Sequence, residues 1–320
     1  MHEHKQNQCK RKVKNRKNVV GLIIFCITVG IVFLYAYYQN LRKEIDARQK
    51  WLETEKKAVG RYLDWHTGIL LETDGKMGIY RKESGKLIYK EKVDSEDGYL
   101  GMYLFLMGKY LEKTENTDLP EYWKKGISLA LKKIQSLMRD GITQVSEENT
   151  TAYLMDNLEV WKGLHELELA GLEDTQAISE MRKKIQAQIE NIFWDDANQR
   201  WRIIGNSDLY DQTEFYPDGV AQIYPLIYEF PVKEKKKQKI LYDQFTEKFQ
   251  WQKLNKKING FLWAMTGMAA AQMGDINNLV ELIEIMKQNA VRIENIRFTQ
   301  AKRDGYAWNV RNCIDYMKEK

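Results

Sequence analysis

One stretch decides the fold: SEDGYLGMYLFLMGKYL, residues 95–111. Its large apolar side chains recur three, four and seven residues apart, the spacing that gathers them on one face of a helix. They are Leu100, Tyr103, Leu104, Met107, Tyr110 and Leu111. The stretch therefore predicts an amphipathic helix with a buried apolar face and acidic residues at its start.

The same spacing recurs through the rest of the chain. It predicts a helix opened by Pro120, and further helices near residues 153–170, 173–192, 217–229, 233–249, 260–273, 276–291 and 303–318. Residues 66–94 differ, because their glycines and short apolar pairs predict a β-hairpin or a long loop, and residues 193–204 predict a short strand-like turn. Short connections make consecutive helices antiparallel neighbours, so the fold class is all-α.

Two architectures suit such a series of helical hairpins, a closed (α/α)6 toroid and an open solenoid. Solenoid repeats carry a fixed motif, and neither the tetratricopeptide nor the ankyrin pattern occurs here. Instead, an acid or amide stands beside an aromatic ring at the start of every second predicted helix. The five segments are residues 96–99, 153–157, 214–219, 259–263 and 304–309. If alternate helices form an inner ring, these segments converge on one mouth, which favours the toroid.

A mouth of this composition suits a sugar polymer. Aromatic rings stack on the apolar faces of pyranoses, while carboxylates and amides bind hydroxyl groups. Hydrolysis needs two carboxyls at the scissile bond, one to donate a proton and one to activate water or attack. The alternative for each acid alone is a helix cap that satisfies free backbone N–H groups, and the alternative for Trp161 and Trp263 is a place in the core.

Residues 95–102, SEDGYLGM, resemble the acid motif of the family 8 glycoside hydrolases, approximately Ser-Glu-Gly-Gln-x-Tyr-Gly-Met. The serine, the glutamate and the closing Gly-Met are in register, and the tyrosine stands one place early. More widely, residues 66–320 resemble the six-hairpin glycosidase superfamily, whose members are (α/α)6 toroids that process polysaccharides. The resemblance implies that Glu96 is the general acid, with Asp97 as the competing assignment.

Two further segments extend the resemblance. Residues 155–161, MDNLEVW, echo the Asp-Ala-Asp motif of the family and make Asp156 a catalytic candidate, although the first acid has no counterpart. Residues 214–225 are similar to segments that open an inner helix in the superfamily, and Asp218 there is the candidate base. The side chains predicted to bind substrate are Tyr99, Asn157, Glu214, Tyr216, Gln222, Trp263, Tyr306 and Trp308.

Residues 19–38, VVGLIIFCITVGIVFLYAYY, contain no charge and no proline and would form a helix about 30 Å long, the thickness of a bilayer core. Seven basic residues and one acidic residue precede them, so the positive-inside rule places the N-terminus in the cytoplasm. The sequence thus predicts a cytoplasmic basic tail (1–18), an uncleaved transmembrane signal anchor (19–38), a juxtamembrane linker helix (39–65) and an extracytoplasmic domain (66–320). A cleaved signal peptide and a buried core helix are the alternatives.

Charge and composition limit the partners. Beyond the basic tail the net charge is close to zero, which argues against a nucleic-acid partner, while residues 19–38 would contact membrane lipid. Cys9, Cys26 and Cys313 fall in three compartments on this topology, so no disulfide is expected within the chain. His66 and His165 are the only histidines after the anchor, which makes a zinc site improbable. No cofactor is implied, and a calcium ion held by clustered acids is left open.

The leading hypothesis is a membrane-anchored glycoside hydrolase that acts on a cell-surface or exported polysaccharide by two-carboxylate acid/base chemistry. The alternative is a catalytically inactive toroid that binds polysaccharide or scaffolds a synthesis or export complex with a membrane polysaccharide synthase. A third reading is a helical solenoid that binds proteins.

Overall fold

The computed structural model describes residues 56–84, 86–114, 119–172, 175–205, 207–211, 213–253 and 265–293. Nearly all of them belong to the compact unit Tyr62–Lys320, and the unit Met1–Arg61 contributes only its last residues. The predicted membrane span at 19–38 and the helix near 303–318 lie outside the described residues. Within the described ranges, no helix combines the length and the apolar character needed to cross a bilayer.

The described elements are mainly helical. The helices are a first helix at 56–72, α2 (Glu96–Thr114), α3 (Glu121–Leu137), α4 (Leu154–Leu169), α5 (Thr175–Phe193), α6 (Val220–Ile227), α7 (Lys235–Phe249), α8 (Thr266–Met273) and α9 (Ile276–Ile293). Short π and 3-10 turns lie at η1 (Phe215–Gly219) and η2 (Trp251–Lys253). The strands form three antiparallel hairpins: β1 (Gly78–Glu83) with β2 (Lys86–Lys92), β3 (Met138–Arg139) with β4 (Ile142–Thr143), and β5 (Trp194–Asp195) with β6 (Arg200–Trp201).

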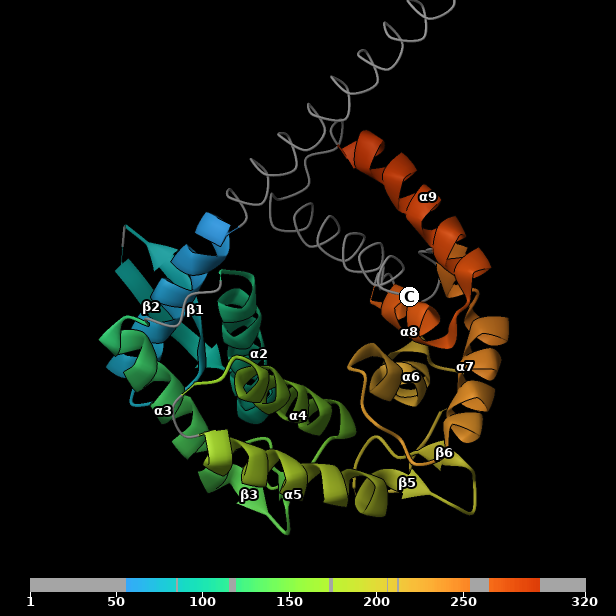
Figure 1. Cartoon of the computed structure of the whole chain (residues 1–320), viewed down its shortest axis with the longest axis horizontal. Coiled ribbons are helices and arrows are strands. Elements are labelled where there is room, and N and C mark those ends of the chain that lie inside the picture. Colours follow the sequence, from blue (N-terminus) through green and yellow to red (C-terminus); the bar gives the residue numbers. More distant parts are fainter. Residues whose placement is uncertain are drawn as a thin grey trace, which may run out of the picture. The chain divides into compact units, whose positions relative to one another are not determined.

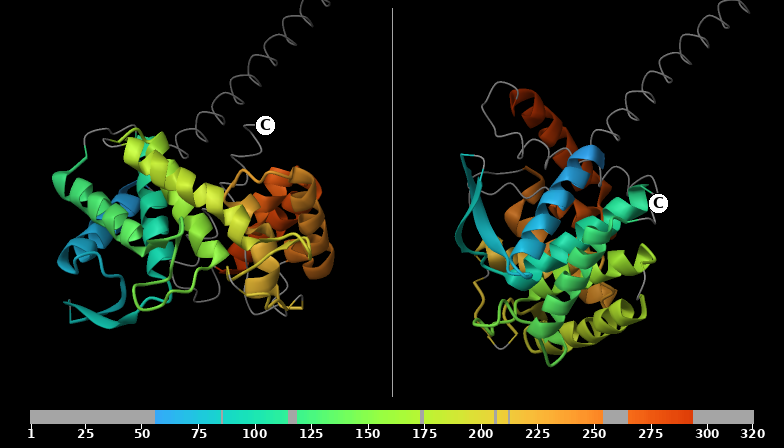
Figure 2. Two further views of the ribbon diagram at one scale, coloured as in Figure 1. Left: turned by 90° about the horizontal axis from the view of Figure 1, so that it is seen from below. Right: turned by 90° about the vertical axis from the view of Figure 1, so that its left-hand side faces the viewer.

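The sequence pattern predicted these elements well. The all-α class is confirmed, Pro120 is the N-cap of α3, and residues 78–92 form a β-hairpin rather than a long loop. Figure 2 shows this hairpin beside the helices of its unit. The strand-like turn near residue 193 is the hairpin β5–β6. Trp161 is buried, as the core alternative expected.

Alternate helices of the unit Tyr62–Lys320 form two rows. The helices α2, α4, α6 and α8 contact one another in that order, and each also contacts the next helix along the chain, which for the last three is α5, α7 and α9. Figure 1 shows α4 and α6 inside the row made by α3, α5 and α7. This pairing is the hairpin array expected from the sequence, whereas closure by a sixth hairpin stays a prediction because residues 294–320 lie outside the described ranges.

Glycines bring α2 and α4 into direct backbone contact. A Cβ atom on Gly101 would lie 2.6 Å from the backbone nitrogen of Val160, and one on Gly163 would lie 2.2 Å from the Gly101 carbonyl oxygen. Only glycine permits such an approach. Around this crossing, Leu100, Leu104 and Leu158 are fully buried, so the contact of α2 with α4 lies in the core.

Candidate active site

The start of α2 is fixed by hydroxyl groups. The Ser95 hydroxyl accepts a hydrogen bond from the Gly98 backbone N–H at 3.2 Å, which caps the helix, and donates to Asp97 Oδ1 at 2.8 Å. The Thr143 hydroxyl lies 2.7 Å from the other Asp97 oxygen. Asp97 is fully buried, and both of its oxygens are occupied by these hydroxyl groups. It is therefore placed to support the site rather than to meet a ligand.

Two more carboxylates approach the same point from α4. The position that a Cβ atom would take on Gly98 lies 2.7 Å from Glu159 Oε2, 2.9 Å from Ser95 Oγ and 3.3 Å from Asp156 Oδ1. Because Asp156 and Glu159 are one helical turn apart, they share one face of α4. We call Asp97, Asp156 and Glu159 the carboxylate cluster. It is located where the N-termini of α2 and α4 meet.

Burial and mutual repulsion favour the protonated forms of these acids. Burial raises the pKa of Asp156 well above its ordinary value, and the neighbouring charges of Asp97 and Glu159 raise it further. Burial, with Asp97 as a further contributor, raises the pKa of Glu159 to about 7. The pKa of Asp97 is also raised by burial, although its hydroxyl partners oppose the shift. A cluster that holds a proton near neutral pH has the property required of a general acid.

Tyrosines surround Glu159. The Tyr224 hydroxyl donates to Glu159 Oε1 at 2.5 Å, and the Tyr228 hydroxyl lies 3.5 Å from the same oxygen. Both phenols are buried; Tyr224 is on α6 and Tyr228 is the residue that caps its C-terminus. Tyr216 in η1 is 44% exposed, and its pKa is raised by burial and by the charges of Asp156 and Glu159. An exposed aromatic ring therefore stands beside the cluster, and the role of Tyr216 in substrate binding stays a prediction.

Two of the predicted catalytic acids, Glu96 and Asp218, are not members of this cluster. Glu96 precedes Asp97 on α2, and its electrostatic neighbours are Lys133, Lys92 and the acids of residues 147–148. Burial raises its pKa. Asp218 accepts a hydrogen bond from the Asp211 backbone N–H at 2.7 Å, and burial raises its pKa too. No contact described in the structure joins either acid to Asp156, so their roles as acid and base stay predictions.

Two predicted substrate ligands are engaged with the backbone. Asn157 is fully buried, accepts from the Thr143 N–H at 2.7 Å and donates to the carbonyls of Thr143 and Tyr153. Gln222 pairs with the backbone N–H and carbonyl of Trp201 at 2.8 and 2.9 Å. These contacts hold β4 against α4 and β6 against α6.

The remaining predicted ligands are divided between the surface and the undescribed segments. Tyr99 is 44% exposed on α2, next to Gly98, and Glu214 begins η1. Trp263, Tyr306 and Trp308 lie outside the described residues.

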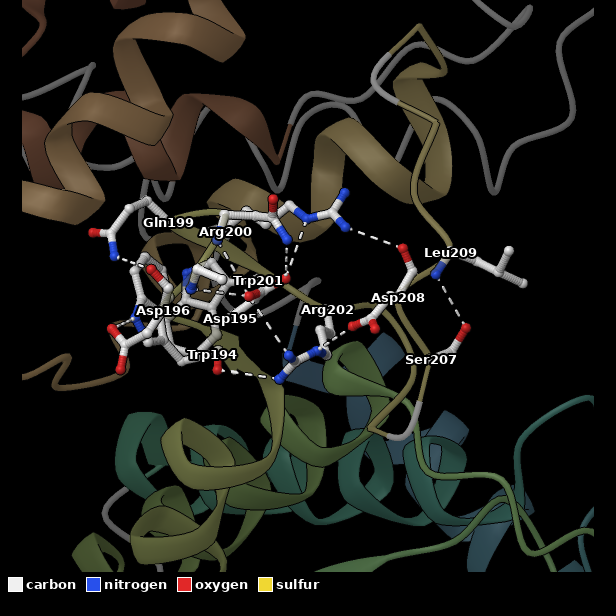
Figure 3. Close-up of polar contacts among 12 residues, drawn as sticks. Trp194, Asp195, Asp196, Gln199, Arg200, Trp201, Arg202, Ser207, Asp208 and Leu209 are labelled. Carbon is white, nitrogen blue, oxygen red and sulfur yellow. Dashed lines mark hydrogen bonds and ion pairs between the residues drawn. The ribbon is translucent and has the colours of Figure 1, made fainter.

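The hairpin β5–β6 supports the start of α6. Figure 3 shows Nε of Arg200 and the guanidinium of Arg202 facing Asp195, while a terminal nitrogen of Arg200 donates to the Asp208 carbonyl and Arg202 meets the Asp208 carboxylate. The nitrogen–oxygen distance is 3.7 Å from Arg200 to Asp195, 3.5 Å from Arg202 to Asp195 and 3.0 Å from Arg202 to Asp208. Since Trp201 of the same hairpin is bonded to Gln222, this ion-pair network fixes the strand that α6 packs against.

A hollow of about 1010 Å³ has none of the three residues of the carboxylate cluster in its lining. It is lined by the β3–β4 turn, residues 150–152 and α5. It contains Arg139, Asp140 and Lys184 but no cluster of acids, so we do not place the chemistry there. Among the described residues, no group of three or more histidine, cysteine or acidic side chains is arranged to hold a metal ion.

Sequence reasoning missed Glu159. The signal was available in the Asp156-x-x-Glu159 spacing, which puts two acids on one helical face close to the helix N-terminus. What the spacing does not reveal is that Gly98 of another helix lies against that face. The close approach of α2 and α4 turns two ordinary acids into a desolvated cluster.

Comparison with known proteins shows a likeness of fold. No family model matches the chain, and no curated protein matches it. Among solved structures, a glycosidase superposes with a TM-score of 0.50 at 13% identity, covering 72% of this chain and 68% of its own. The GH78 family rhamnosidase of Bacillus sp. GL1 superposes with a TM-score of 0.48 at 13% identity, covering 74% of this chain and 25% of its own. A glycosidase in complex with glucose superposes with a TM-score of 0.45 at 13% identity, covering 61% of this chain and 53% of its own.

The chain spans about half the length of the glucose-bound glycosidase. At 13% identity the likeness concerns the fold alone: the helical array has a glycosidase-like fold. The narrower resemblance to family 8 stays a prediction.

Proposed function

We propose that the protein is a glycoside hydrolase whose reacting carboxyls are Asp156 and Glu159. The observation that carries the proposal is the carboxylate cluster at the N-termini of α2 and α4, with a glutamate whose pKa is about 7. The glycosidase-like fold supports the same reaction class, and the exposed Tyr216 supplies an aromatic ring beside the acids.

In this mechanism Glu159 is the general acid. Burial keeps it protonated up to about pH 7, so it can protonate the oxygen of the leaving sugar. Because two neighbouring carboxyls do not both ionise readily, the pair shares a proton; with that proton on Glu159, Asp156 is the ionised second carboxyl and activates water or attacks the sugar directly. Asp156 Oδ1 and Glu159 Oε2 lie 3.3 and 2.7 Å from one point, so they are at most about 6 Å apart, which admits the separation of about 5–5.5 Å found in retaining glycosidases.

Asp97 positions the pair. Burial is the main cause of the raised pKa of Asp156 and Glu159, and the charge of Asp97, stabilised by the hydroxyls of Ser95 and Thr143, adds to it. The predicted membrane anchor at residues 19–38 would hold the site near a polymer made or exported at the same membrane, which makes a cell-surface or exported polysaccharide the first substrate to test.

The test is the release of reducing ends from a panel of polysaccharides by the purified full-length protein. We expect release by the wild type and a loss of at least a hundredfold in Asp156→Asn and Glu159→Gln. The matched controls are Glu96→Gln and Asp218→Asn, which change acids outside the cluster. Activity lost in the controls but kept in the cluster variants would move the site to those acids, and no release from any polymer would leave binding without turnover as the function.

A further inference from the structure

A group of aromatic rings lies next to the carboxylate cluster, and the reaction proposed above does not use it. His66 of the first helix is at its centre, with ring centroids 4.9 to 6.4 Å from those of four neighbours. The neighbours are Tyr62, Trp65, Tyr99 and Tyr103. Tyr99 directly follows Gly98, so the ring group begins one residue from the point that the carboxylates surround.

Three of these rings face solvent. Tyr62, Trp65 and Tyr99 are 44%, 43% and 44% exposed, whereas Tyr103 and His66 beneath them are buried. We call Tyr62, Trp65 and Tyr99 the aromatic platform. Tyr103 is held by a 2.8 Å hydrogen bond to Thr67, which fixes the floor under the platform.

The floor is uncharged. Burial lowers the pKa of His66 to about 4, so its ring is neutral at physiological pH and packs as an aromatic plane. The described structure gives its two nitrogens no hydrogen-bond partner. A neutral ring packed between Tyr62 and Tyr103 restricts the rotamers of the exposed rings, and restricted rings lose less entropy when they bind a ligand.

A further exposed ring comes from another segment of the chain. Tyr216 of η1 interacts electrostatically with Asp156 and Glu159, whereas the platform rings come from the first helix and α2. Exposed rings of this size are scarce elsewhere in the described chain, where Tyr89 and Tyr122 are the other examples among tyrosines and tryptophans. Exposed rings from the first helix, α2 and η1 near paired carboxyls suit a chain of sugars longer than the two units at the scissile bond.

We propose that the aromatic platform binds the extended part of a polysaccharide substrate, several sugar units away from Glu159. The ligand class is a chain of pyranoses whose C–H faces can lie flat on the rings. The phenol hydroxyls and the indole N–H bond its hydroxyl groups. This inference rests on the carbohydrate activity proposed above, and it adds residues of the first helix to the binding surface.

The experiment measures binding separately from cleavage. Full-length Glu159→Gln protein, in which turnover is blocked, is screened on an array of α- and β-linked hexasaccharides, and the hexasaccharide bound best is titrated by calorimetry. Adding Trp65→Ala should raise the Kd about tenfold, the equivalent of one lost stacking contact, and Trp65→Phe should restore most of the affinity. Tyr89→Ala removes an equally exposed tyrosine from β2 and should leave the Kd unchanged.

Equal affinities for Trp65→Ala and Tyr89→Ala, or no array glycan bound, would overturn the inference. Circular dichroism of each variant separates lost binding from lost folding. The two proposals fail in different ways. If the protein cleaves a glycan but its Kd does not change in Trp65→Ala, only the platform proposal is refuted. If the Kd depends on Trp65 but no reducing ends are released, only the hydrolase proposal is refuted. In an active wild-type background, Trp65→Ala should raise KM for the hexasaccharide and leave kcat within twofold.

Discussion

Replacing Glu159 by glutamine tests whether this carboxyl serves the reaction rather than the stability of the fold. Glutamine keeps the shape of the side chain and an oxygen that accepts the Tyr224 hydroxyl, but it removes the charge. In the wild type that charge is opposed by burial and by Asp97, which together raise the pKa of Glu159 from an ordinary value of 4.5 to about 7. The folded protein therefore holds a proton on Glu159 more tightly than the unfolded chain does.

The direction of the pH effect follows from this shift. A raised pKa in an acid stabilises the folded state at low pH, and that stability is lost as the pH rises from 4.5 to 7. At about 1.4 kcal/mol per pH unit, ionised Glu159 costs about 3 kcal/mol above pH 7 and about 1 kcal/mol at pH 5. Glu159→Gln should increase the free energy of unfolding by about these amounts at pH 8 and pH 5, while abolishing hydrolysis.

The assay is urea unfolding at pH 5 and pH 8, followed by circular dichroism. Glu166→Gln is the matched control, because Glu166 lies two turns further along α4 and is also buried. Burial alone would raise its pKa, but Lys162 and Lys109, each 2.8 Å away, outweigh burial and lower it. Removing its charge leaves Lys109 with Glu112 and Lys162 with Glu229 as the remaining acidic partner, and the lost charged contacts should cost about 2 kcal/mol. A Glu159→Gln variant less stable than the wild type at pH 8 would refute the reasoning.

Three further outcomes are expected. Gly163→Ala places a Cβ atom 2.2 Å from an α2 carbonyl oxygen and should lower the free energy of unfolding, measured by urea titration, by more than about 3 kcal/mol. Gly68→Ala is the control: its Cβ atom would have no atom within 4 Å, and the substitution should raise the free energy of unfolding by about 0.5–1 kcal/mol. Asn157→Ala leaves the buried N–H and carbonyl of Thr143 without their partner and should lower the Tm, consistent with a loss of about 3 kcal/mol. The rate kcat/KM should fall above about pH 7 as Glu159 loses its proton, and a flat pH profile to pH 9 would contradict its role as acid.

The helices could be predicted from the sequence because the spacing of the apolar residues marks the buried face of each helix. The apolar spacing of residues 95–111 predicts α2, and the burial of Leu100, Leu104 and Met107 follows from it. The recurrence of acids and aromatic rings at alternate helix starts also identified Asp156, Tyr99 and Tyr216, which the structure brings to one region. These signals are local, and local chemistry is what a single sequence carries.

Which of two neighbouring acids joins the carboxylate cluster could not be predicted from the sequence. Glu96 and Asp97 are adjacent, and consecutive residues point about 100° apart on a helix, so only the packing of α2 decides which one meets α4. That packing depends on Gly98 and Gly101, because a side chain at either position would collide with α4. The closing glycine of the SEDGYLGM stretch therefore has a sufficient explanation in helix contact, independent of any family resemblance.

The account's central claim, that the carboxylate cluster acts on a glycosidic bond, is tested most directly by where a glycan binds. The measurement is a crystal structure of the Asp156→Asn protein with the oligosaccharide that the wild type cleaves or binds best. We predict a glycosidic oxygen within about 3.2 Å of a Glu159 carboxyl oxygen, with sugar rings continuing over Trp65. A glycan seated instead in the hollow beside Arg139 and Lys184, or at Asp218 with Glu159 untouched, would contradict it.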